Sequence, residues 1–249
     1  MKIIKICSIF LLYIFFYKAH CDSIFLLSIP KCGTHLLAKA IELMTDKKLA
    51  NEIEEHTVEL NGLPKPNITT FGRCHLPYSK IYETQLQKDF KTFFIYRDPR
   101  DQVVARAYWT QKLVRGMYHM NSVSNPPMPS ISQLIDYIIK DIDKYYSKFM
   151  PWKHSTGICT LKFENLIGSF GGGKEHLQKN ALKKICKFLN IKFDKINYCI
   201  KNLFGKSQTF REGKIGSWKT HFNQNQKNQF KKIAGKLLID LKYEKNFTW

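Results

Sequence analysis

The sequence predicts an α/β fold of one domain, in which helices cover both faces of a mostly parallel central sheet in three layers. Short apolar runs typical of buried strands alternate with helical patterns along the chain, and this order is typical of parallel sheets. The 249 residues are 44% hydrophobic and 14% aromatic, which is enough to bury a sizeable core. Neither an internal repeat nor a linker divides the chain into two domains.

The first 21 residues have the pattern of an export signal. Lys2 and Lys5 precede an almost wholly apolar stretch from residue 6 to residue 17. As a helix of about 1.5 Å per residue this stretch would measure roughly 18 Å, well short of a hydrocarbon core of about 30 Å. We therefore predict a signal peptide over residues 1–21, with a short signal anchor or a buried first element as alternatives. The protein is then exported or lumenal, and it is cytoplasmic if the signal does not function.

Two strand–loop–helix units come next. In the first, an apolar run at residues 23–29 leads into a loop that holds Gly33, and residues 34–44 have helical spacing. In the second, the strand predicted at residues 91–96 is followed by a helix that includes residues 102–109. Such a unit directs backbone N–H groups and the positive end of a helix toward an anion.

The rest of the chain continues the alternation. We predict helical residues 131–149, a third strand at 157–163, a helix at 177–189 and a helical stripe at 230–241, with irregular segments at 61–70, 122–130 and 168–173. The glycine-rich stretch that ends at Lys174 is similar to a nucleotide-binding loop, but Glu175 stands where a Mg²⁺-holding Ser or Thr is needed. We therefore do not expect a nucleotide triphosphatase.

The charge of the chain favours anionic partners. Lys and Arg number 40 and Asp and Glu 20, a formal net charge of +20, which attracts phosphorylated or sulfated ligands, nucleic acid and anionic lipid. We interpret the lysine-rich residues 174–206 as a solvated face, with a polyanion-binding surface as the alternative. The seven cysteines form no CxxC pair and no His lies at zinc-ligand spacing, so we predict no metal site. A Cys186–Cys199 disulfide is left open.

Four segments contain the residues suited to chemistry. They are Pro30–Leu37 (PKCGTHLL), Arg73–Pro77 (RCHLP), Arg97–Ala105 (RDPRDQVVA) and Arg211–Thr220 (REGKIGSWKT). In content and order they resemble the motifs of the cytosolic-type sulfotransferases, which use 3′-phosphoadenosine 5′-phosphosulfate (PAPS). The resemblance spans about residues 24–225. It implies a P-loop-like fold, with residues 22–249 forming one sulfotransferase domain.

The resemblance also implies a donor site. Residues Lys31, Cys32, Gly33, Thr34 and His35 would hold the 5′-phosphosulfate, and Arg97, Ala105, Phe163, Arg211 and Gly213 would line the part of the site that takes the 3′-phosphate and the adenine. A guanidinium fork suits a phosphate because two parallel N–H groups match two oxygens. The family mechanism requires no metal.

The implied reaction is in-line transfer of a sulfuryl group to a hydroxyl or amine acceptor. His75 would be the general base, Lys31 would neutralise the leaving oxygen, and Arg73 would steady the sulfuryl oxygens. An exported enzyme would meet carbohydrate, peptide or lipid acceptors, and a small-molecule acceptor is also compatible with the motifs. Besides PAPS, its product adenosine 3′,5′-bisphosphate (PAP) and the acceptor, we expect no specific nucleic acid; a homodimer is left open.

Several positions depart from the family pattern. Ala105 replaces a serine that donates to the 3′-phosphate, and losing such a bond costs roughly 1.5–3 kcal/mol unless Arg100 or Lys214 substitutes. Leu36 replaces a tryptophan that stacks on adenine, and Glu212 replaces a lysine. The alternative function is therefore an inactive relative, or a basic protein that binds nucleic acid or another polyanion without chemistry.

Three residues in these segments have structural interpretations. Asp98 and Asp101 stand just before or inside a predicted helix, where a carboxylate satisfies the first backbone N–H groups, so we interpret both as caps. We interpret Trp218 as a packing residue of the last segment.

Overall fold

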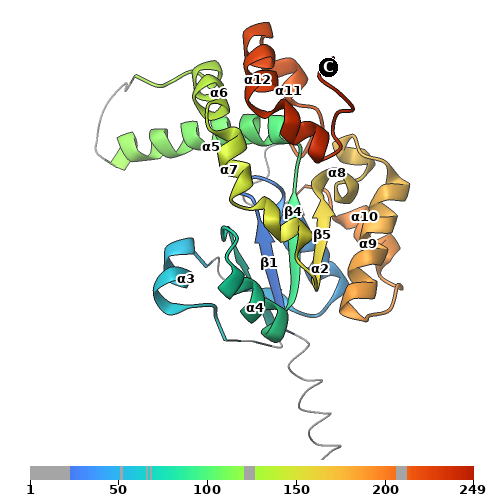
Figure 1. Cartoon of the computed structure of the whole chain (residues 1–249). Helices are drawn as coiled ribbons and strands as arrows, with labels where there is room; N and C mark the ends of the chain where they lie inside the picture. The colour runs from blue at the N-terminus through green and yellow to red at the C-terminus, as the bar shows by residue number, and fades with distance from the viewer. Residues whose placement is uncertain (1–22, 51–52, 66, 68, 121–126, 206–211) are drawn as a thin grey trace, which may run out of the picture.

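A parallel sheet forms the centre of the molecule (Figure 1). The computed structural model describes residues 23–50, 53–65, 67, 69–120, 127–205 and 212–249. Within these ranges, five strands lie in the order β2-β3-β1-β4-β5, and every pairing is parallel. The strands are β1 (Ile24–Ser28), β2 (Lys48–Leu49), β3 (Thr70–Cys74), β4 (Lys91–Tyr96) and β5 (Ile158–Lys162). The predicted α/β fold with a mostly parallel sheet is confirmed.

Helices cover both faces of the sheet and make three layers (Figure 1). One face packs against α3 (Glu55–Asn61), α4 (Lys80–Asp89), α5 (Pro99–Met120), α6 (Ile131–Ile139), α7 (Ile142–Ser147), α11 (Trp218–His221) and α12 (Gln224–Asp240). The other packs against α2 (Thr34–Met44), α8 (Phe163–Leu166), α9 (Glu175–Leu189) and α10 (Ile196–Asn202). On β1, Phe25 and Leu27 belong to the first core and Ile24 and Leu26 to the second, as the two-residue period of a strand requires.

Most of the predicted elements form, with adjusted bounds. The helix expected over residues 131–149 is divided into α6 and α7 because Asp141 has a non-helical ψ of 6°. Helix α5 begins earlier than predicted, at Pro99, whose fixed φ and missing N–H suit a first helical position. The stripe at 230–241 lies in the second half of α12, which begins at a capping box between Asn223 and Gln226. Of the irregular segment 122–130, residues 122–126 lie outside the described residues.

Strand β3 was not predicted as a strand, although it contributes to the candidate site. Its sequence, TFGRC, has no apolar run, and a glycine and an arginine weaken the β pattern. The strand forms because it pairs with β1 on one side and with the two-residue strand β2 on the other. Tertiary pairing therefore decides this element.

The amino-terminal prediction lies beyond what the structure describes. Residues 1–21 fall outside the described residues, so the signal peptide, its anchor alternative and the export route remain predictions. The described helices include none that is both long enough and apolar enough to cross a membrane. Cys186 and Cys199 are free thiols, with Cys186 3.7 Å from the Met44 sulfur and Cys199 3.7 Å from the Ala40 carbonyl oxygen, so the disulfide left open does not form.

Candidate active site

The segments predicted to carry chemistry follow neighbouring strands at one edge of the sheet. His75 follows β3, the Pro30–Gly33 loop follows β1, Arg97 follows β4 and Phe163 follows β5. Because the sheet is parallel, all four lie at its carboxyl edge, the upper end of the strands in Figure 1. Ligands of open α/β sheets bind at this edge.

The loop between β1 and α2 is a tight turn that requires its glycine. Gly33 has a φ of 103°, and a Cβ added there would lie 2.6 Å from Cδ2 of Phe163. The Cys32 N–H donates to the Ile29 carbonyl at 3.1 Å, so it is already used within the turn. Because the first N–H groups of a helix have no intrahelical acceptor, an anion at this turn would be held at Gly33 and Thr34.

Arg97 is a buried cation of the site, with 7% of its surface exposed. Its guanidinium carbon lies 4.2 Å from the centre of the Phe163 ring, and its Nη2 donates to the Lys214 carbonyl at 2.6 Å. Nη2 also lies 3.7 Å from Oδ2 of Asp101. Its Nε is buried and has no hydrogen-bond acceptor within the described part of the chain. Gly33 and Arg97 therefore contact the same aromatic ring, and one nitrogen of Arg97 still has a bond to give.

Asp101 has a different role from the one we predicted. Its two carboxylate oxygens accept the N–H groups of Gly216 at 2.8 Å and of Trp218 at 3.0 Å, so it fastens the last motif to α5 and does not cap the helix. Burial raises the pKa of Asp101, and the Arg97 charge opposes that rise. Asp98 does cap α5, because its Oδ1 accepts the Arg100 N–H at 2.9 Å.

Arg100 cannot supply the donor that is lost at Ala105. Its Nη2 lies 2.7 Å from Oδ2 of Asp98 and its Nη1 2.6 Å from Oε1 of Glu244. Its guanidinium also lies against the rings of Trp218 at 4.1 Å and Trp249 at 4.7 Å. With 3% of its surface exposed, Arg100 is committed to the scaffold, and Trp218 is the packing residue we predicted.

His75 is held in one orientation by Ser28, the last residue of β1. The Nδ1 atom of His75 lies 3.0 Å from both the carbonyl oxygen and the Oγ of Ser28. A carbonyl only accepts, so Nδ1 carries a proton, and in the neutral ring Nε2 has the lone pair. Ser28 Oγ also lies 2.5 Å from Oγ1 of Thr34, which links the histidine to the start of α2.

Arg73 and His35, both predicted site residues, meet between β3 and α2. Nη1 of Arg73 lies 2.7 Å from Nδ1 and 3.0 Å from Nε2 of His35. Arg73 is buried, and it shares the sheet face of Phe71, which packs into the α2 side of the sheet. An arginine in the middle of a strand thereby finds a polar partner on the helix that covers it.

Three other predicted residues lie nearby, and one lies outside the description. Lys31 has its ammonium 4.4 Å from the centre of the Trp109 ring on α5. Ala105 is half-buried on the same helix. Gly213 has a φ of 60° and directly precedes Lys214, the carbonyl partner of Arg97. Arg211 lies outside the described residues, so its role remains a prediction.

Two residues that sequence reasoning missed hold the loop from behind. The Tyr146 hydroxyl donates to the Arg97 carbonyl at 3.0 Å and lies 3.5 Å from the Cys32 sulfur. Gln102 donates to the Pro30 carbonyl at 3.0 Å. Burial raises the pKa of Cys32 to about 12, so this thiol is neutral at physiological pH. Tyr146 carries no sequence signal, because nothing local distinguishes it from a core tyrosine.

The glycine-rich segment at 168–173 supports the last motif. It follows α8 and not a strand, and the Gly171 carbonyl accepts the Ile215 N–H at 2.9 Å. A Cβ on Gly171 would lie 2.5 Å from the Gly213 carbonyl oxygen, so the glycine allows close backbone packing. Among the described residues, no group of three or more His, Cys, Asp or Glu side chains is placed to hold a metal ion.

The fold has a parallel sheet between two layers of helices, with a glycine turn after β1 and a buried arginine after β4. These features place the chain in the P-loop-like class of α/β proteins. A family model described as the sulfotransferase domain matches residues 21–242. The chain therefore belongs to the sulfotransferase family. The resemblance predicted from the four motifs is confirmed, and so, at the level of the family, is the prediction of a PAPS-dependent sulfotransferase.

Relatives and solved structures agree with this assignment. Sulfotransferase 2A1 of Homo sapiens is 22% identical over 92% of this chain and 88% of its own length, and sulfotransferase 6B1 of Homo sapiens is 26% identical over 92% and 82%. The crystal structure of mouse sulfotransferase SULT7A1 complexed with PAP has a TM-score of 0.59 at 21% identity, covering 89% of this chain and 85% of that one. Retinol dehydratase in a complex with retinol and PAP has a TM-score of 0.60 at 13% identity, covering 88% and 82%. At these identities the structures support the fold.

Proposed function

We propose that this protein transfers a sulfuryl group from PAPS to a hydroxyl or amine acceptor, with His75 as general base. The observation that carries the proposal is the contact of both the Gly33 turn and the Arg97 guanidinium with the Phe163 ring. A single nucleotide of adenylate size can then reach the turn with one phosphate and the arginine with another. The mouse relative complexed with PAP supports this choice of donor.

The residues present fit such a donor. The turn at Gly33 has no room for a side chain beside Phe163, and the N–H groups at the start of α2 suit the 5′-phosphosulfate. Nε of Arg97 is a buried donor without an acceptor in the described chain, which suits the 3′-phosphate. Ala105 has no hydroxyl and Arg100 is bound to Asp98 and Glu244, so Lys214 is the remaining predicted substitute; without it, donor binding is weaker by the worth of one charged hydrogen bond, roughly 1.5–3 kcal/mol.

The proposed chemistry moves one proton and exchanges one sulfur–oxygen bond. Nε2 of His75 takes the proton of the acceptor hydroxyl while the acceptor oxygen attacks the sulfur. The bond between sulfur and the bridging phosphate oxygen breaks, and Lys31 offsets the charge that grows on that oxygen. Arg73, held by His35, faces the sulfuryl oxygens. In this scheme Ser28 keeps His75 in the tautomer that can accept.

The acceptor class is proposed from the predicted compartment. If residues 1–21 direct export, the acceptors are hydroxyl groups met in a secretory lumen, on carbohydrate, peptide or lipid. PAPS must then be supplied to that compartment.

The test is a transfer assay with labelled PAPS and a mixed acceptor panel. His75→Ala should abolish labelling while PAP binding, measured by titration calorimetry, stays within about twofold, because the base contacts the acceptor and not the nucleotide. His176→Ala, an exposed histidine on α9, is the matched control and should behave as wild type. Labelling that survives in His75→Ala would show that His75 is not the base.

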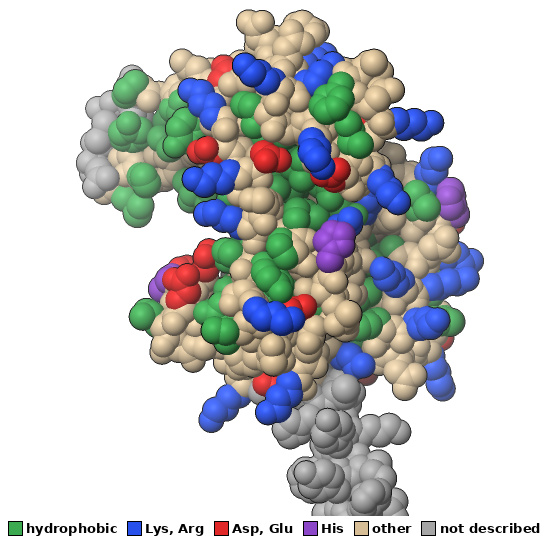
Figure 2. Space-filling view, in the orientation of Figure 1, with side chains coloured by type: hydrophobic (Ala, Val, Ile, Leu, Met, Phe, Trp, Pro, Cys, Tyr) green, Lys and Arg blue, Asp and Glu red, His purple; other side chains and the backbone are tan. Residues whose placement is uncertain are grey.

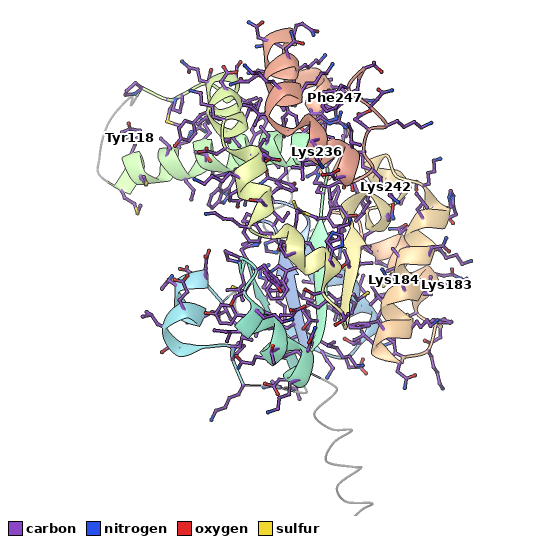
Figure 3. All side chains as sticks on the ribbon, in the orientation of Figure 1. Tyr118, Lys183, Lys184, Lys236, Lys242 and Phe247 are labelled. Carbon is purple, nitrogen blue, oxygen red and sulfur yellow. The ribbon has the colours of Figure 1, made fainter. Side chains whose placement is uncertain are left out.

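A DNA-binding titration at several salt concentrations, run beside the PAP titration, tests the alternative function. A basic polyanion-binding protein would show no affinity for PAP and would bind DNA with steep salt dependence. The lysines of α9, among them Lys183 and Lys184 (Figure 3), would then form the binding surface, and replacing them with uncharged residues would weaken DNA binding.

A further inference from the structure

A peptide unit beside the candidate site is held from both sides by side chains. It joins Arg97 to Asp98 and lies just beyond the end of β4. The Tyr146 hydroxyl of α7 donates to its carbonyl oxygen at 3.0 Å, and Oε1 of Glu164 accepts its N–H at 2.8 Å. In a trans peptide the carbonyl and the N–H point in opposite directions, so the two bonds together resist rotation of this peptide plane.

Glu164 comes from α8, the short helix after β5, and its carboxylate has two donors. Besides the Asp98 N–H, the Tyr243 hydroxyl donates to it, to Oε2 at 2.9 Å. Burial raises the pKa of Glu164, so the carboxylate lies in a desolvated place. On the face that Figure 2 shows, Lys and Arg cover more of the surface than Asp and Glu. A carboxylate that leaves such a basic surface needs hydrogen bonds to compensate, and Glu164 has two.

The start of α5 has half of a capping box. Asp98 is the N-cap, and its Oδ1 accepts the Arg100 N–H at 2.9 Å. In a complete capping box the side chain at the third helical position accepts the N-cap N–H in return, and here that position is Asp101. Both oxygens of Asp101 instead accept N–H groups of the last motif. Glu164, from another element, takes the place of this missing partner by accepting the Asp98 N–H.

We propose that Glu164 is a positioning residue for both parts of the 3′-phosphate site, an inference that rests on the proposed function. By accepting the Asp98 N–H, it fixes the backbone that carries the Arg97 side chain. By completing the cap of α5, it leaves Asp101 to hold the last motif, in which the Lys214 carbonyl accepts from Arg97 at 2.6 Å. Glu164 does not contact the donor; it acts through Arg97 and Asp101.

Charge and geometry predict opposite results for neutral variants of Glu164. A carboxylate near a phosphate repels it, so every neutral residue should raise PAP affinity if charge alone matters. If the hydrogen bond matters, only a residue that can still accept keeps the affinity. Glutamine keeps an acceptor oxygen, and its amide can donate to the Tyr243 oxygen in place of the present bond. Leucine has a similar size and no acceptor.

The experiment is calorimetric titration of the full chain with PAP. Glu164→Gln should bind PAP as wild type does, or up to about threefold more tightly because a negative charge is gone. Glu164→Leu should bind at least about tenfold more weakly, because the Asp98 N–H loses its charged acceptor and Arg97 its fixed backbone. If Glu164→Leu does not fold, as judged by circular dichroism, Glu164→Met takes its place.

Leu182→Ala controls for stability. Leu182 is buried on α9, in the core on the α2 side of the sheet, so its truncation should lower the melting temperature. PAP affinity should not change in this variant. A loss of affinity in Leu182→Ala equal to that in Glu164→Leu would assign the effect to general destabilisation and overturn the positioning role.

Amide hydrogen exchange at Asp98, followed by NMR, needs no nucleotide. The Asp98 N–H should exchange at least about tenfold faster in Glu164→Leu than in wild type, and at the wild-type rate in Glu164→Gln. This exchange pattern in a wild-type protein that does not bind PAP would reject the proposed donor and keep the role of Glu164 in holding the peptide. The inference is overturned if Glu164→Leu binds PAP as wild type does, if both neutral variants bind more tightly, or if both lose the same affinity.

Discussion

Arg97 combines a fixed position with an unused donor. Phe163 lies beneath its guanidinium, the Lys214 carbonyl accepts from Nη2, and Asp101 lies beside the same nitrogen. These contacts leave the side chain little freedom, so a ligand that accepts from Nε does not have to order it first. Pre-ordering of this kind raises affinity by lowering the entropic cost of binding.

Replacement of Arg97 separates charge from geometry. Arg97→Lys keeps the positive charge but loses the planar fork, so PAP affinity should fall about 10- to 100-fold, the effect of one charged hydrogen bond. Titration calorimetry with PAP measures the change. If the affinity is unaltered, Arg97 does not contact the nucleotide.

Cys32 should be chemically inert in the folded protein despite its place in the turn between β1 and α2. Burial raises its pKa to about 12, so the reactive thiolate is a very small fraction near pH 8 and grows as the pH approaches 12. Iodoacetamide at pH 8 should leave Cys32 unmodified in the native protein and modify it after denaturation, as read by peptide mass spectrometry. Rapid native labelling of Cys32 would contradict the buried placement.

At the scale of elements, the turn between β1 and α2 is the most constrained segment of the site. Gly33→Ala places a Cβ against Phe163 and forces a φ of 103° on a residue with a side chain. We expect a loss of about 2–4 kcal/mol, from backbone strain together with overpacking. Gly172→Ala is the control, since Gly172 has a similar left-handed conformation (φ 83°, ψ 11°) but nothing within 4 Å of its Cβ; it should lose only about 1 kcal/mol.

Urea unfolding measures both variants, and a double variant identifies the clash. Phe163→Leu removes the ring that the new Cβ would meet, so the combined loss in Gly33→Ala/Phe163→Leu should be smaller than the sum of the two single losses. Additive losses would show that strain alone makes Gly33 necessary.

The elements that the sequence predicts well are those with strong local patterns. β1 and β4 are uninterrupted apolar runs and α2 has helical spacing, and all three form at or within one residue of the predicted bounds. The site could be placed because its motifs follow such strands. β3 could not be recognised from TFGRC, because its formation depends on its neighbours in the sheet.

Residue roles that depend on partners far along the chain could not be predicted from the sequence either. Asp101 resembles a helix cap locally, but it binds Gly216 and Trp218, more than a hundred positions along the chain. We predicted that Arg100 could bind a phosphate, but its guanidinium pairs with Glu244 and packs against two tryptophan rings. Such partners have no local signature in one sequence.

At the scale of the whole molecule, residues 244–249 pack against Arg100 and Trp218. Trp249 packs against Trp218 and Phe230 with ring centres 5.7 and 6.3 Å apart, and it lies 4.7 Å from the Arg100 guanidinium. The Lys231 ammonium donates to the Trp249 carbonyl at 2.6 Å. The end of the described chain is therefore part of the scaffold that holds α5 and the last motif together.

Trp249→Ala should destabilise the protein by about 2 kcal/mol or more, because a large ring leaves a partly buried position. It should also weaken PAP binding, since Arg100 and the last motif lose a support. Tyr137→Ala, an exposed ring on α6, is the control and should change neither quantity. Thermal unfolding and PAP titration give the two readings; a wild-type melting temperature in Trp249→Ala would argue against the scaffold role.

The all-parallel pairing has a kinetic consequence. Ile24 pairs with Lys91 and Thr92 with Ile158, so each of the two central ladders joins strands about 65 residues apart. Long loops must close before these ladders form, which slows folding and leaves apolar strands such as FLL and FFI unpaired in the meantime. The newly made chain should therefore depend on chaperones, and refolding yield should fall steeply as protein concentration rises.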